Sequence, residues 1–492
     1  MTIQSSLPED FKVKSYNEHY FSRQKREWNF PCYNLLMENK TFFFYDLETS
    51  GLSAREDRIM QFAGQRTDLE LNPIGEPVNI LVRMENDTLP SPCAIAVTKI
   101  TPQKTREDGL SEAEFCRFLQ EEIFTENTIA LGFNTVRFDD EFMRHLFWRN
   151  FYDPYEWEWK DGRSRWDMLD VVRLTRALRP EGINWPFRED GKPTNRLELI
   201  TKLNGIEHEH AHDALADVFA TIAVAKLIKE KQPSLFNFLF NLRDKRAVKK
   251  LVNLENPVPF VYASGRYSSE FNNTTVAFPF APAKNGNILV FDLRYDLEEL
   301  MNKQDEEGKD KFYPMVKEMA YNKCPAVAPI SVLEKNEGWA KIGLSKEQIE
   351  TNIKTLLNHP EFLEERKQKA FEEKEWGKAS DAESALYDSF LPDGDKVRVN
   401  AVRNANANEL ADFHPNFIDE RLPELLLHYK AKNFPTSLSE DEVKIWETYR
   451  LSRLNRLEPK FMKELELVAK DEKNSFIVEE LKLWYESLAP DF

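Results

Sequence analysis

The sequence has little cysteine, no long apolar run and a shortage of positive charge. Its 492 residues include four cysteines, which lie far apart and form no C-x-x-C pair. This excludes a disulfide framework and a zinc site built from cysteine pairs. No stretch approaches the roughly 18 apolar residues of a membrane-spanning helix, and residues 1–40 lack the apolar centre of a secretory signal. We therefore expect a cytoplasmic protein without a membrane partner.

Acidic residues outnumber basic ones, with 84 Asp and Glu against 67 Lys and Arg and a formal net charge of −17. Such a balance is unusual for a protein that binds nucleic acid, because phosphate groups attract basic surface. A local basic groove can still bind a strand, and bound cations can offset clustered carboxylates. The charge therefore leaves nucleic acid open as a partner.

A run of aromatic residues, Phe42–Tyr45, precedes Asp46 and Glu48 and predicts a buried strand that ends at Ser50. Alternate side chains of a strand point to the same face, so Asp46 and Glu48 share one face. Two carboxylates at the end of a buried strand are costly unless a cation lies between them. Their oxygens suit a hard cation such as Mg²⁺, although they equally suit the plain polar end of a strand.

Two later segments carry polar residues in similar settings. Asn134 and Asp139 follow an apolar run, residues 128–132, which predicts a strand, a turn and the start of a helix. His212 and Asp217 open a second apolar helix. In chain order the motifs are therefore D-x-E, N-x4-D and H-x4-D.

This order and spacing resemble the DEDD exonucleases that carry histidine in the third motif. Further segments resemble bacterial exodeoxyribonuclease I, and they extend the resemblance over residues 41–492. These segments are 134–141, 149–155, 164–170, 178–186, 204–208, 322–325 and 429–435.

The resemblance implies an α/β fold with three domains, and the length alone predicts two or three. Residues 41–232 would form a ribonuclease-H-like exonuclease domain with a mixed sheet. Residues 233–385 would form an SH3-like β-barrel domain with a helical insertion, and residues 386–492 a C-terminal α-helical domain. Residues 1–40 would be an N-terminal extension.

The residue pattern predicts individual elements for this fold. Residues 236–252 predict one helix, residues 257–296 predict strands with an Asn285–Gly286 hairpin, and Ser345 and Ser439 predict capping-box helix starts. Strands are predicted over 42–47, 58–68, 79–83 and 129–133, and helices over 111–124, 140–150, 167–178 and 214–229.

The activity implied by the resemblance is Mg²⁺-dependent 3′→5′ hydrolysis of single-stranded DNA to nucleoside 5′-monophosphates, in DNA repair and recombination. Two Mg²⁺ ions, for which Mn²⁺ can substitute, would support an in-line displacement at phosphorus. Their ligands would be Asp46, Glu48, Asp139 and Asp217. His212 would be the general base, because an imidazole titrates near pH 6.5 and can accept a proton at neutral pH.

A different interpretation makes the alternating residues His208, His210 and His212 ligands of a zinc ion. The chain has eight histidines and no second histidine-rich segment, so we prefer the general base. Two other functions stay open. A 3′→5′ exoribonuclease would share the motifs, and a single-stranded nucleic-acid-binding module would lack activity.

Binding of a single strand requires a positive track and stacking surfaces. Leu52 and Phe138, beside the predicted ligands, suit contact with terminal bases and equally suit core packing. The resemblance also implies docking of the C-terminal tail of the single-stranded DNA-binding protein, for which Arg179 is the candidate residue, and a monomer. The predicted substrate contacts are Glu48, Leu52, Asn134, Phe138, Arg165 and Trp166.

Overall fold

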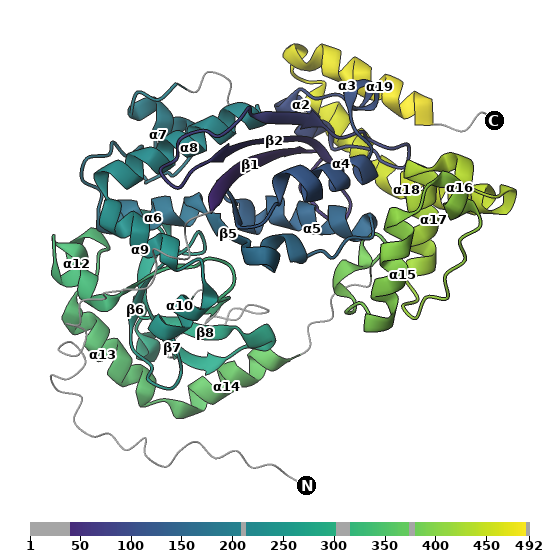
Figure 1. Cartoon of the computed structure of the whole chain (residues 1–492). Coiled ribbons are helices and arrows are strands. Elements are labelled where there is room, and N and C mark those ends of the chain that lie inside the picture. Colours follow the sequence, from purple (N-terminus) through teal and green to yellow (C-terminus); the bar gives the residue numbers. More distant parts are fainter. Residues whose placement is uncertain (1–39, 208–212, 302–314, 373–378, 489–492) are drawn as a thin grey trace, which may run out of the picture. The chain divides into compact units, whose positions relative to one another are not determined.

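The protein is described from a computed structural model, which covers residues 40–207, 213–301, 315–372 and 379–488 (Figure 1). The chain divides into two compact units. Among the described residues, the larger unit takes in 40–172, 180–207, 213–244 and 379–488. The smaller one takes in, among the described residues, 173–179 and 245–372.

The larger unit contains a five-stranded sheet in the order β3-β2-β1-β4-β5. β1 is antiparallel to β2 and parallel to β4, β2 is antiparallel to β3, and β4 is parallel to β5. The sheet is therefore mixed, as predicted, and β1 is its central strand. The strands are β1 (Thr41–Thr49), β2 (Ile59–Thr67), β3 (Val78–Leu81), β4 (Thr128–Gly132) and β5 (Ser164–Asp167).

The central strand β1 is buried on both faces, because its aromatic residues alternate between two cores. Phe43 and Tyr45 pack with the residues of α4 (Glu112–Phe118) and α5 (Asp139–Arg149). Phe42, on the opposite face, packs against Trp166 and against the α9 helix (Pro233–Asn241). α8 (Ala214–Lys231) also packs against β1 and β2. The sheet thus lies between α8 and α5 (Figure 1), and Asp46 continues the face that carries Phe42.

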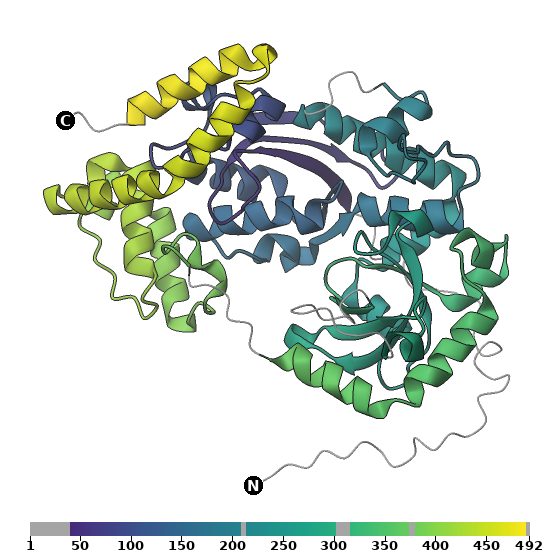
Figure 2. The ribbon, with the colours of Figure 1, turned by 180° about the vertical axis from the view of Figure 1, so that it is seen from behind.

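The C-terminal segment of the larger unit is helical, as predicted. Trp148 of α5 donates a hydrogen bond of 2.8 Å to the carbonyl of Ala382, and the last two helices pack on α2 and α3 (Figure 1, Figure 2). Ser439 forms the expected capping box with Glu442. The remaining helices of this unit include α2 (Pro92–Thr98), α3 (Pro102–Asp108), α7 (Leu197–Leu203), α15 (Asp393–Asn404), α16 (Ala407–Ala411), α17 (Leu422–Asn433), α18 (Glu440–Val468) and α19 (Ser475–Leu488).

The smaller unit contains a second five-stranded sheet, in the order β10-β6-β7-β8-β9, with antiparallel neighbours throughout. The Asn285–Gly286 hairpin is confirmed, since both residues adopt positive φ between β7 and β8. Its strands are β6 (Phe260–Ala263), β7 (Thr274–Pro282), β8 (Ile288–Asp292), β9 (Val316–Met319) and β10 (Ala326–Pro329). Its helices include α10 (Lys245–Leu251), α11 (Leu297–Met301), α12 (Gly338–Lys341), α13 (Lys346–Leu357) and α14 (Pro360–Phe371).

Two predicted helices are wrong in extent. The helix predicted over 236–252 is interrupted after Asn241, where the Arg243 guanidinium donates to the carbonyl of Phe240 at 2.8 Å and so satisfies the helix end. The helix predicted over 111–124 continues past Phe118 only as a wider π-turn. The helix predicted from residue 167 is α6 (Met168–Leu178), which is preceded by the unpredicted strand β5.

Candidate active site

Three carboxylates meet at the end of the central strand. One oxygen from each of Asp46, Glu48 and Asp217 lies within 4.8 Å of the others. β1 supplies the first two because they are two residues apart on one face. α8 supplies the third, and the Asp213 side chain caps this helix by accepting hydrogen bonds from Leu215 N at 3.0 Å and Ala216 N at 3.3 Å. The cap fixes the first turn of α8, which carries Asp217.

The fourth predicted ligand, Asp139, is the first residue of α5. Its Oδ1 accepts a hydrogen bond of 3.2 Å from the backbone N–H of Leu47, the residue between Asp46 and Glu48. The neighbouring Asp140 lies elsewhere, since it accepts from the Tyr45 hydroxyl and pairs with the Arg165 guanidinium. The structure therefore brings Asp139 to the cluster and separates Asp140 from it.

The carboxylates of this acidic cluster (Asp46, Glu48, Asp139 and Asp217) repel one another. Burial and the charges of Asp139 and Asp217 raise the pKa of Asp46 well above its usual value. Burial and the charge of Asp46 raise the pKa of Glu48 to about 9, and burial also raises the pKa of Asp139. A cation bound among these oxygens would relieve the repulsion. A donor set of carboxylates alone fits a hard divalent cation.

A buried aspartate holds the loop of the second motif. Asp167 accepts hydrogen bonds of 3.1 Å from the backbone N–H groups of Asn134 and Val136. Asn134 itself has φ 76°, a left-handed conformation that Asn tolerates better than most residues. Burial and the charge of Asp170 raise the pKa of Asp167 to about 7. The three sequence motifs do not include Asp167, although the segment 164–170 carries part of the family resemblance.

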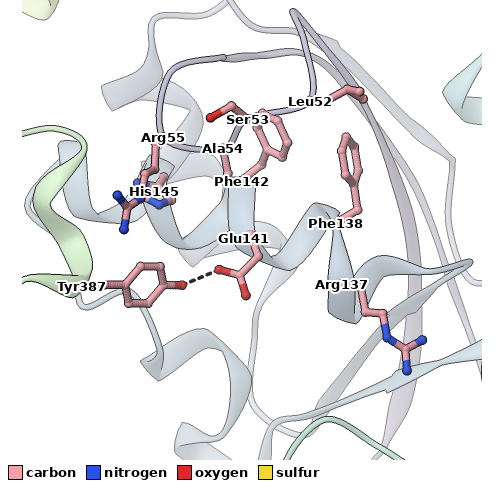
Figure 3. Close-up of a pocket in the computed structure, with 10 residues that line it drawn as sticks. All are labelled: Leu52, Ser53, Ala54, Arg55, Arg137, Phe138, Glu141, Phe142, His145 and Tyr387. Atoms are coloured by element: carbon pink, nitrogen blue, oxygen red, sulfur yellow. Dashed lines mark hydrogen bonds between the residues drawn. The ribbon is translucent and has the colours of Figure 1, made fainter. Parts of the chain in front are cut away.

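The other predicted substrate contacts differ in their exposure. Leu52 is 85% exposed, Phe138 is half-buried, and both line one cavity (Figure 3). Arg165 is only 6% exposed and pairs with Asp140 and Glu158.

Trp166 is 2% exposed and packs against Phe42, Phe236 and Phe240. Trp166 and Arg165 are therefore both buried, and their role as substrate contacts stays a prediction. Both residues belong to β5, which pairs with β4 and so buries them in the sheet.

Two further predictions concern the remaining site residues. His212, with His208 and His210, lies outside the described residues, and its role as general base stays a prediction. Arg179 is half-buried at the end of α6. Its guanidinium donates a hydrogen bond of 2.6 Å to the carbonyl of Leu178. Its role in partner binding also stays a prediction.

No helix within the described ranges combines the length and apolarity that a membrane crossing requires.

Three family models match consecutive parts of the chain. The "Exonuclease" model matches residues 43–225. The "Exonuclease I SH3-like domain" matches residues 243–373 and the "Exonuclease I C-terminal domain" matches residues 380–488.

The chain is also similar over most of its length to known proteins. It is 40% identical to exodeoxyribonuclease I of Haemophilus influenzae, with 86% of this chain and 92% of the relative covered. It is 38% identical to exodeoxyribonuclease I of Escherichia coli, with 84% and 90% covered. The crystal structure of E. coli exonuclease I with a dA16 oligonucleotide superimposes with a TM-score of 0.87 at 36% identity, covering 92% of this chain and all 100% of that one. The zinc-bound E. coli complex with single-stranded DNA gives a TM-score of 0.85.

The mixed sheet and the acidic cluster at the end of its central strand define an exonuclease of the class that uses divalent metal ions. The two regions that follow in the chain match the SH3-like and C-terminal domains of exonuclease I, which distinguishes this family from other exonucleases of the class. The chain belongs to the exodeoxyribonuclease I family.

Proposed function

We propose that the chain is a Mg²⁺-dependent 3′→5′ exonuclease that degrades single-stranded DNA to nucleoside 5′-monophosphates. The observation that carries the proposal is the convergence of Asp46, Glu48 and Asp217 within 4.8 Å, with Asp139 bonded to the same strand. The similarity to E. coli structures that hold dA16 and dT13 oligonucleotides supports a DNA strand as the substrate.

The metal ions would be held by Asp46, Glu48, Asp139 and Asp217. Two bound ions would lower the pKa of the attacking water and would stabilise the negative charge that develops on the leaving oxygen of an in-line displacement. The protein contributes the placement of the ligands. β1 fixes two carboxylates on one face, the Leu47 N–H orients Asp139, and the Asp213 cap orients the first turn of α8. The all-oxygen donor set favours Mg²⁺ or Mn²⁺ over zinc.

His212 would accept the proton of the attacking water, since it precedes Asp217 by five residues and a neutral imidazole accepts a proton near pH 7. Leu52 and Phe138 would contact the bases next to the scissile bond. Their apolar side chains line one cavity beside the predicted ligands.

The remaining proposals concern the whole chain. We propose domains at residues 41–232, 233–385 and 386–492 after an extension of residues 1–40, and a monomer in the cytoplasm that acts in DNA repair and recombination. The thiols of Cys93 and Cys116 are free, which agrees with a reducing compartment. Docking of the C-terminal tail of the single-stranded DNA-binding protein would involve the Arg179 guanidinium, a group suited to carboxylates.

End-labelled oligonucleotides test this function. With a 5′ label and Mg²⁺, we expect a ladder of progressively shorter single-stranded DNA, and with EDTA no shortening. With a 3′ label, the first product should be a labelled mononucleotide. An RNA strand of the same sequence and a blunt duplex are the matched controls. Shortening of RNA with intact DNA would contradict the substrate, and release of a mononucleotide from the 5′ end would contradict the direction.

A further inference from the structure

A short loop, residues 133–138, connects β4 to α5 and sets the point at which Asp139 enters the acidic cluster. The loop begins directly against the central strand. A Cβ atom on Gly132, the last residue of β4, would lie 2.4 Å from both Thr135 Cγ2 and the carbonyl oxygen of Tyr45. Only glycine permits so close an approach. Because Tyr45 belongs to the strand that supplies two of the carboxylates, a displaced loop would move Asp139 relative to them.

The side chain of Asp167 binds the backbone of this loop at two points. Asp167 is the last residue of β5 and is 3% exposed. Its Oδ1 accepts a hydrogen bond of 3.1 Å from Asn134 N, and its Oδ2 accepts one of 3.1 Å from Val136 N. Oδ1 also accepts 2.8 Å from Leu169 N, in the first turn of α6. Both oxygens are therefore engaged, and one carboxylate joins the loop to the start of α6.

The carboxyl group of Asp167 lies in a setting that disfavours its charge. Burial and the charge of Asp170 raise its pKa to about 7, whereas the backbone hydrogen bonds and the charge of Arg137 lower it. Arg137 belongs to the same loop and donates to Asp170 at 2.8 Å. Asp167 thus binds the loop through its backbone, and Asp170 binds it through a side chain. An apolar residue at position 167 would leave three N–H groups without their acceptor.

We propose that Asp167 is a positioning residue for the divalent metal ions, because it holds the loop so that Asp139 faces the other carboxylates of the acidic cluster. The inference rests on the proposed function, since it takes Asp139 as a metal ligand. The oxygens of Asp167 are occupied by backbone N–H groups, so it acts through Asp139 rather than as a ligand. Asp139 completes the connection with its own bond of 3.2 Å from Leu47 N on the central strand.

Two substitutions separate the loop from the cap of α6. Asp167→Asn keeps one oxygen for Asn134 and Leu169, but its amide nitrogen then faces the N–H of Val136, donor against donor. Asp167→Ser keeps a hydroxyl that can cap α6 and is too short to reach the loop. Both variants lose the same charge. A difference between them therefore reports the hydrogen bonds to the loop and not the charge.

Binding of Mn²⁺ without DNA is the first measurement, followed through the paramagnetic resonance signal of the free ion. We expect the dissociation constant to rise about 10-fold in Asp167→Asn and about 100-fold in Asp167→Ser, the range found when a residue that orients a metal ligand is replaced. The Mn²⁺ concentration at half-maximal strand cleavage should rise in proportion.

Hydrogen–deuterium exchange of the metal-free protein is the second measurement. The amides of Asn134 and Val136 lose an acceptor in the variants, so a peptide that covers residues 133–138 should exchange faster. The increase should follow the same order, with Asp167→Ser above Asp167→Asn. This measurement needs neither a metal ion nor activity.

The matched control is Asp395, a buried carboxylate of the C-terminal helical segment. It is 0% exposed and accepts hydrogen bonds from the backbone N–H groups of Ile418 and Asp419, at 2.9 Å and 2.8 Å. The bonds found for it among the described residues include none to the acidic cluster or to the loop 133–138. Asp395→Asn should therefore lower the melting temperature, as Asp167→Asn does, and leave the Mn²⁺ dissociation constant within about twofold of wild type.

The outcomes separate the positioning role from the proposed function. A wild-type Mn²⁺ affinity in Asp167→Ser, or in a folded Asp167→Asn where Asp167→Ser does not fold, would overturn the inference. Equal losses in the two variants would overturn it in favour of charge, and an equal loss in Asp395→Asn would overturn it in favour of general stability. Graded losses of Mn²⁺ affinity in a protein that cleaves no strand would support the inference and contradict only the proposed function.

Discussion

Two groups of carboxylates in the larger unit are held in opposite ways. The acidic cluster contains Asp46, Glu48, Asp139 and Asp217 at the end of β1. A second group, which we call the ion network, joins residues near the sheet to the C-terminal helical segment. The ion network consists of Arg58, Asp87, Glu383, Lys432 and Arg453.

The ion network supplies its own cations. Arg58 pairs with Glu383 at 2.6 Å, and Lys432 pairs with Asp87 at 3.1 Å. Burial alone would raise the pKa of Asp87, but the charges of Lys432, Arg453 and Arg58 outweigh it and hold that pKa well below its usual value. The same balance lowers the pKa of Glu383.

Burial is common to both groups, so the neighbouring charges decide the direction of the shift. In the acidic cluster the neighbours that shift the pKa values of Asp46 and Glu48 are further carboxylates. The ion network holds the C-terminal segment to the sheet, and in it three cations face two carboxylates. The carboxylates of the acidic cluster face one another, and a bound cation can relieve the repulsion between them. We therefore propose that the ion network is structural and that the acidic cluster holds metal ions.

The largest expected effect is the loss of cleavage activity when one carboxylate of the acidic cluster is replaced. Asp46→Asn should lower the rate of strand cleavage in Mg²⁺ by about a thousandfold, because it removes charge from the predicted metal site. It should also raise the melting temperature of the metal-free protein, since it removes one of the repelling carboxylates. Single-turnover cleavage and thermal unfolding in EDTA measure the two effects. A fall in metal-free stability together with normal cleavage would contradict the assignment.

The matched change in the ion network should act on stability. Asp87→Asn leaves Lys432 and Arg453 buried with less negative charge and should cost about 3–5 kcal/mol of unfolding free energy. Urea unfolding at neutral pH measures the loss. Below the unfolding transition, the rate of strand cleavage should stay within about twofold of wild type, because Asp87 contacts no residue of the acidic cluster among the pairs that the described residues form. A stability equal to wild type would contradict the role of the ion network.

The smallest expected effect is a difference between the acidic cluster and the ion network in how each makes the stability of the metal-free protein depend on pH. A raised pKa of about 9 for Glu48, against an ordinary 4.5, means that the folded metal-free protein binds more protons than the unfolded chain between these values. Metal-free stability should therefore fall as the pH rises through that window, and Glu48→Gln should reduce the slope. The ion network contributes the opposite sign, since its stability is lost as the pH falls through the lowered pKa of Asp87. Thermal melts in EDTA from pH 5 to pH 9 measure the slope, and an equal slope in Glu48→Gln would contradict it.

The sequence predicted the parts of the site that depend on local spacing. The alternation of β1 placed Asp46 and Glu48 on one face, and the apolar pattern after Asp213 predicted α8 with Asp217 in its first turn. The choice of Asp139 over Asp140 came from the family motif. The structure gives its physical basis, which is a backbone bond from Leu47 on one side and an ion pair with Arg165 on the other.

The features that the sequence did not predict depend on contacts between distant segments. β5, β9 and β10 have only four residues each, too few for alternation to identify a strand. The sequence therefore predicts Trp166 only as a substrate contact and gives no sign of its pairing with β4, which buries it. Tyr387 reaches Glu141 from 246 positions along the chain.

The central claim is that the acidic cluster binds divalent cations. Crystals of the wild-type protein soaked in Mn²⁺ test it through anomalous difference maps recorded at the manganese edge. The account predicts peaks within about 2.0–2.4 Å of the oxygens of Asp46, Glu48 and Asp217, and their loss in Asp46→Asn. A wild-type map with no peak at this position, or with the carboxylates turned away from one another, would contradict the claim.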